Sequence, residues 1–66
     1  MTNEKQELIE IFHELLSIVR SARDAYSELL MDENLIGKRR IVVQNLHDDK
    51  ERHMEIAQEI INTLES

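Results

Sequence analysis

Two side chains in the second half of the chain have types and a spacing that suit chemistry. Asp49 and His53 stand four residues apart, so on a helix they share one face and their side chains can meet. A carboxylate beside an imidazole suits a pH-sensitive contact, a hydrogen-bonded pair or a metal site. We favour a hydrogen-bonded polar layer that fixes helix register, with Lys50 as its third member. A metal ion held by Asp49 and His53 is the less favoured alternative.

A second carboxylate–imidazole spacing occurs near the start of the chain. Glu10 and His13 have the Glu-x-x-His spacing that di-iron helical bundles use. Both fall on the polar side of the heptad pattern described next, whereas ligands for a bundle core must point inward. We therefore interpret them as a solvated face and expect no cofactor. Because the sequence also has no cysteine, no glycine-rich phosphate loop and no nucleophile elbow, we expect a protein that is not an enzyme.

The elements that would position these residues are long amphipathic helices. Apolar residues from Leu8 to Leu29 keep a 3-4 spacing over three heptads, which defines positions a and d. Most of the neighbouring e and b positions are also apolar, so the apolar face is four positions of seven wide. A face this broad must contact two or more helices, as in a bundle. We expect the first helix over about residues 3–32, with Thr2 or Asn3 as its N-cap.

The second half of the chain repeats the same broad face. With Leu46 at position a, the apolar pattern holds on both sides of a polar stretch, residues 47–53, which contains the polar layer. The only glycine, Gly37, and the polar residues before it predict a turn within 32–38 and a second helix over about 38–65.

An alternative division of the second half has three helices in the chain. Asp48 followed by Glu51 resembles a capping box at a helix start, which would place a break near residues 46–48. We favour one continuous helix, because the apolar periodicity resumes in register after the polar stretch.

The predicted fold class is all-α, a single domain over residues 1–66 that forms an antiparallel two-helix hairpin. One hairpin buries one side of each helix and leaves an apolar stripe roughly 45 Å long. We therefore predict that two hairpins dimerise into a four-helix bundle. The residues predicted to form the dimer core are Leu8, Ile11, Phe12, Leu15, Ile18, Val19, Leu46, Ile56, Ile60 and Leu64.

The charge of the chain narrows the classes of partner. The formal net charge is −6, which disfavours binding to nucleic-acid backbones. The polar N-terminus is no signal peptide, and no apolar run reaches the roughly 18 residues that span a bilayer, so we expect a cytoplasmic protein without a membrane contact. Acidic columns of like charge and one basic cluster suggest a surface for another protein. The residues predicted for that surface are Asp24, Glu28, Asp32, Lys38, Arg39 and Arg40.

Two family resemblances bear on function. The segment LIGKRRIVVQNLHDDKERHMEIAQEII resembles the second helix of ferritin-like and rubrerythrin-like proteins, although Lys50 stands where their Glu-x-x-His motif has Glu. That resemblance implies a metal-binding half-bundle. The size and plan are similar to plasmid copy-number repressor hairpins, which dimerise and bind RNA. The function we favour is a homodimeric regulator, adaptor or inhibitor that binds another protein, and a purely structural oligomerisation module is a further alternative.

Overall fold

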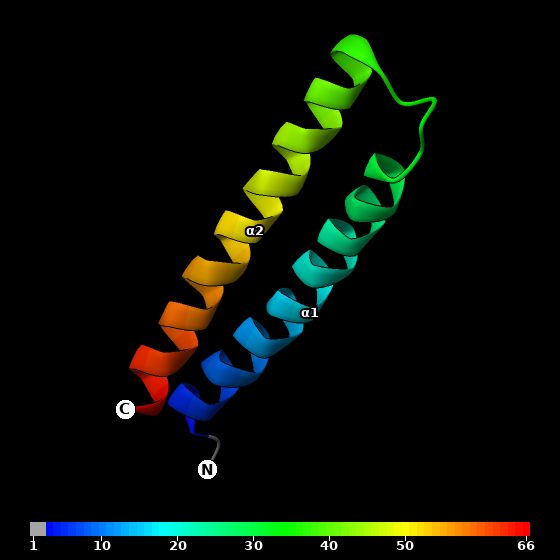
Figure 1. Ribbon diagram of the computed structural model, residues 1–66. Helices are drawn as coiled ribbons and strands as arrows, with labels where there is room; N and C mark the ends of the chain where they lie inside the picture. Colours follow the sequence, from blue (N-terminus) through cyan, green and yellow to red (C-terminus); the bar gives the residue numbers. More distant parts are fainter. Residues whose placement is uncertain (1–2) are drawn as a thin grey trace.

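The computed structural model describes residues 3–66 and contains two helices, α1 (Glu4–Leu30) and α2 (Gly37–Glu65). The helices run antiparallel side by side, with the loop at one end and both termini at the other (Figure 1). The molecule is a rod with Cα dimensions of 54 × 16 × 13 Å. The predicted all-α helical hairpin is confirmed.

Local sequence explains where α1 begins and ends. The Asn3 side chain accepts a hydrogen bond from the Lys5 backbone N–H at 3.0 Å, which makes it the N-cap, and Thr2 lies outside the described residues. Glu4 and Glu7 in the first turn suit the positive end of the helix dipole. The helix ends at Leu30, two residues before the predicted boundary.

The loop, residues 31–36, is held by two polar side chains. The carboxylate of Asp32 accepts a hydrogen bond from the Asn34 backbone N–H at 2.9 Å. Arg40, from the first turn of α2, donates to the carbonyl oxygens of Leu30 at 2.8 Å and Leu35 at 2.9 Å. It therefore satisfies a carbonyl group that the end of α1 would leave unpaired.

Helix α2 begins at Gly37, whose φ of +64° lies in the left-handed region that glycine adopts at low cost. From there the helix is continuous to Glu65 and passes through the polar stretch without interruption. The break considered near residues 46–48 is therefore not present, and the favoured continuous helix is confirmed.

Only four side chains of the described residues are buried hydrophobics: Ile9 and Leu16 from α1, and Ala57 and Ile61 from α2. Three of them form one cluster, against which Phe12 and Met54 pack. These residues lie in the half of the hairpin that contains the termini. A core this small contributes little apolar burial for a chain of 66 residues.

Candidate functional site

The contact between the two helices uses only half of the broad apolar face. The buried residues Ile9, Leu16, Ala57 and Ile61 all occupy b or e positions. Eight large apolar residues at a and d positions are instead exposed, among them Leu29 and Val42 near the loop end. The other six define what we call the open face: Leu8, Ile11, Leu15, Ile18, Leu46 and Ile56.

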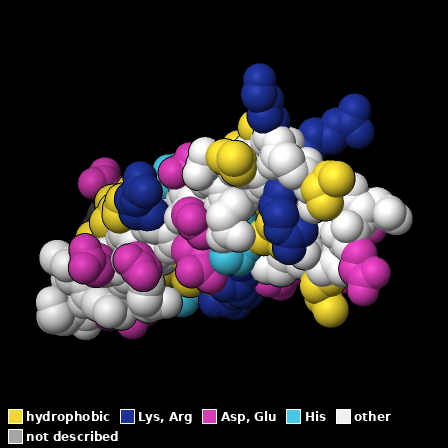
Figure 2. Space-filling view, turned by 45° about the horizontal axis from the view of Figure 1, so that its top comes forward, with side chains coloured by type: hydrophobic (Ala, Val, Ile, Leu, Met, Phe, Trp, Pro, Cys, Tyr) yellow, Lys and Arg dark blue, Asp and Glu magenta, His cyan; other side chains and the backbone are white. Residues whose placement is uncertain are grey.

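The apolar rows of the two helices lie on the same side of the hairpin. Around each helix axis, the a and d positions lie to the same side of the b and e positions when the helix is viewed from its N-terminus. Because α2 runs opposite to α1 and the b and e positions of both helices face each other, the a and d positions of both helices lie on one side of the hairpin. A shallow groove between the helices confirms this placement. Its walls are Phe12, Leu15, His53, Ile56, Ala57 and Ile60. Apolar side chains that reach the surface between charged ones are visible in Figure 2.

The remaining predicted dimer-core residues are half-buried within one hairpin. Phe12 packs against the core cluster, and Val19, Ile60 and Leu64 are also partly covered. Whether a second hairpin covers the rest stays a prediction.

The three residues predicted as a polar layer lie near the middle of α2. His53 is exposed and lines the groove of the open face, while Asp49 and Lys50 are half-buried. The carboxylate of Asp49 forms an ion pair with Arg52, with 3.6 Å between Asp49 Oδ1 and Arg52 Nη1. Within one hairpin Asp49 therefore has a partner other than His53, and the polar layer stays a prediction.

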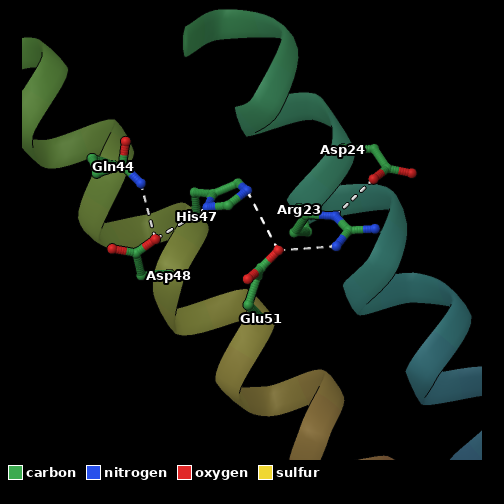
Figure 3. Close-up of polar contacts among 6 residues, drawn as sticks. All are labelled: Arg23, Asp24, Gln44, His47, Asp48 and Glu51. Carbon is green, nitrogen blue, oxygen red and sulfur yellow. Dashed lines mark hydrogen bonds and ion pairs between the residues drawn. The ribbon is translucent and has the colours of Figure 1, made fainter.

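A polar cluster that the spacing of residues did not predict connects the two helices (Figure 3). Arg23 of α1 donates from Nη1 to Glu51 of α2 at 3.1 Å and from Nε to Asp24 at 2.8 Å. The hydrogen bond to Asp24, and to a lesser extent the one to Glu51, raises the pKa of the Arg23 guanidinium above its ordinary value. His47 Nε2 lies 3.8 Å from the same Glu51 oxygen, so the Glu51 carboxylate contacts one side chain from each helix.

The cluster continues along the surface of α2. His47 Nδ1 lies 3.1 Å from Asp48 Oδ1, and the amide of Gln44 donates to that oxygen at 2.9 Å. The contacts with His47 and then Gln44 hold the pKa of Asp48 below its ordinary value. The sequence signal for this cluster was Arg23, a charged residue at a b position. The b positions of Ile9 and Leu16 face the other helix of the hairpin, so a charged residue at such a position predicts a polar contact between the helices.

The residues predicted to bind another protein lie at or near the loop end. Asp24 and Glu28 are exposed on α1, but Asp32 lies beyond the end of the helix and belongs to the loop. Lys38 and Arg39 are exposed and, with apolar neighbours, line a shallow groove at the start of α2. Arg40, in contrast, is engaged by the loop carbonyl groups described above.

His13 of the Glu10 and His13 pair contacts the other helix of the hairpin. His13 Nε2 lies 3.4 Å from Glu65 Oε1, at the end of the hairpin that contains the termini. Across residues 3–66, no group of three or more His, Cys, Asp and Glu side chains is placed to hold a metal ion.

Neither α1 nor α2 has an apolar stretch long enough to cross a membrane. Comparison with known proteins finds no matching family model, no matching curated protein and no matching solved structure.

Proposed function

We propose that this chain is a non-enzymatic helical module that pairs with a second copy through its open face and, as a dimer, binds another protein. The observation that carries this proposal is the open face itself. A row of large apolar side chains along a 54 Å rod is unusual on a monomer, where extended apolar patches are small. Such a face is typical of helices that bury it against other helices.

The size of the open face supports pairing with a surface as large as another hairpin. The open face covers part of one broad side of the rod, whose Cα dimensions of 54 × 16 Å set an upper limit of about 860 Å² on a flat footprint, and standard interfaces bury roughly 800 Å² per partner. Because only four hydrophobic side chains are buried within the described hairpin, association would also supply much of the core.

Binding of another protein would use the charged surface near the loop, which pairing through the open face leaves accessible. Asp24 and Glu28 present like charges on one helix, and Lys38 presents the opposite charge beyond the loop. Charge complementarity with a partner would set its orientation and association rate. The mechanism we propose is occlusion, in which the dimer covers a charged or grooved site on that partner.

Two experiments test the two parts of the proposal. Light scattering over a range of concentrations measures the mass of the assembly, and a monomer at every concentration would contradict the dimer. A pull-down from the native host, with the wild-type chain and an Asp24→Lys/Glu28→Lys variant, then tests the charged surface. Capture of the same protein by both baits would exclude these acids as its binding site.

A further inference from the structure

Two arrangements of a two-fold dimer bury the open face equally well. In a parallel pair both loops lie at the same end, and the symmetry axis runs along the bundle. In an antiparallel pair the loops lie at opposite ends, and the axis crosses the bundle near its middle. His53 lies near the middle of the rod, so it faces the middle of the partner in both arrangements. The apolar rows and the polar layer therefore do not distinguish them.

The two ends of the hairpin differ strongly in charge. The end with the termini, residues 3–10 and 59–66, carries five acids and one base, a net side-chain charge of −4. The loop end, residues 25–42, carries three acids and three bases, a net side-chain charge of zero. All of these charged side chains are exposed in the hairpin.

This asymmetry favours one arrangement. A parallel pair places the −4 end beside its own copy, and like charges across an interface oppose association. An antiparallel pair instead places each −4 end beside a loop end of zero net charge that carries three bases, so this repulsion is avoided. Arg39 occupies an a position, in the row of the open face, so antiparallel pairing brings its guanidinium toward the acidic end of the partner.

Given the proposed dimer, we infer that two copies of this chain pair antiparallel through their open faces, so that the loop of each hairpin lies beside the termini of the other. The charged surfaces near the two loops then lie at opposite ends of the bundle. The dimer is thus a two-ended binder, with one site toward each end of the bundle.

Distances between single labels decide the arrangement. The chain has no cysteine, so Ile41→Cys near the loop and Asn62→Cys near the termini each accept one spin label, and both positions are exposed. In an antiparallel dimer each like pair of labels is far apart, whereas a label at 41 on one copy lies close along the axis to a label at 62 on the other. In a parallel dimer, two labels at the same position lie at the same height along the bundle axis. A label at 41 and a label at 62 are then separated along the axis by 21 residues, about 32 Å of helix.

The electron–electron distance measurement uses spectroscopically distinct labels for the mixed sample. A short mixed distance with long like distances supports the antiparallel pair. Short like distances with a long mixed distance overturn it and leave the proposed dimer intact, whereas a chain that is monomeric by light scattering overturns the proposed function itself.

A charge reversal gives a second, independent result whose sign differs between the arrangements. Glu59 is exposed beside the apolar row at the end with the termini. In an antiparallel dimer Glu59→Lys replaces an acid by a base near Arg39 of the partner copy, so the dimer Kd rises about fivefold at low salt. In a parallel dimer the same change relieves repulsion, so Kd falls, and that result would contradict the inference. The shift should shrink at 0.5 M salt, where charges on the surface are screened.

Discussion

Ile18 is the residue at which a paired hairpin and a lone hairpin differ most in expected stability. Its side chain is 62% exposed on the open face of α1, and two residues earlier Leu16 is 6% exposed in the core. In a lone hairpin, Ile18→Ala removes atoms that are already mostly in water, so we expect a cost below about 1 kcal/mol. If a second hairpin covers the open face, the same change creates a cavity and costs at least about 2 kcal/mol in each chain.

The effect is doubled in a symmetric dimer. A loss of about 4 kcal/mol per dimer corresponds to a dissociation constant raised roughly a thousandfold. Ile41→Ala is the matched control, because Ile41 is 61% exposed but occupies a c position on the outer side of α2. We expect its cost to be small, and the greater helix propensity of alanine offsets part of it.

Sedimentation equilibrium measures the dissociation constant of each variant, and thermal unfolding followed by circular dichroism at several chain concentrations measures stability. Leu16→Ala serves as the positive control, since its side chain is buried within one hairpin. We expect Ile18→Ala to resemble Leu16→Ala in stability and to weaken the concentration dependence of unfolding. If Ile18→Ala instead matches Ile41→Ala, the open face is not covered by a second hairpin.

Three further predictions concern the loop and the surface of α2. Arg40→Gln should destabilise the chain by about 1–2 kcal/mol in urea unfolding, because two carbonyl groups lose their donor, whereas Lys38→Gln makes the same charge change at little cost. Gly37→Ala should cost about 1–2 kcal/mol through its positive φ alone, since no atom lies within 4 Å of an added Cβ; an unchanged melting temperature would contradict this. The pKa of Asp48 is lowered in the folded chain, so its carboxylate stabilises the fold at pH values above the ordinary carboxyl range, and this stabilisation is lost as the pH falls through the pKa of the folded state. Asp48→Asn should therefore reduce the dependence of the unfolding free energy on pH below about 4. An unaltered acid limb in the unfolding profile would exclude that role.

The periodicity of the sequence was sufficient to predict two long helices and their antiparallel packing. Continuity of α2 through the polar stretch followed from apolar residues that resume in register at Ile56, and the structure confirms it. The end of α1 was harder to place, because Asp32 continues an i, i+4 acidic pattern with Glu28. In the structure its carboxylate accepts the backbone N–H of Asn34, a local contact that competes with the helix.

The pattern did not reveal which half of the broad face closes the hairpin. Positions a and d are those that pack together in coiled coils, yet Leu15 and Ile18 are exposed while Ile9 and Leu16 are buried. A four-position face is equally apolar on both sides, so periodicity alone does not choose between them. The interhelical bond from Arg23 to Glu51 was also missed, since it depends on how the two helices are aligned and not on spacing within either.

The three bases at the start of α2 have a consequence for how the chain folds. Lys38, Arg39 and Arg40 lie at the positive end of the dipole of their own helix, where they are unfavourable, and α1 has no base in its last turn. Arg40 instead donates a hydrogen bond across the loop to the carbonyl oxygen of Leu30, the last residue of α1. Each helix is therefore incomplete at this end without the other, and a peptide of α2 alone should fray from Gly37. We expect the two arms to acquire helix cooperatively, as one unit, and not as preformed rods that later dock.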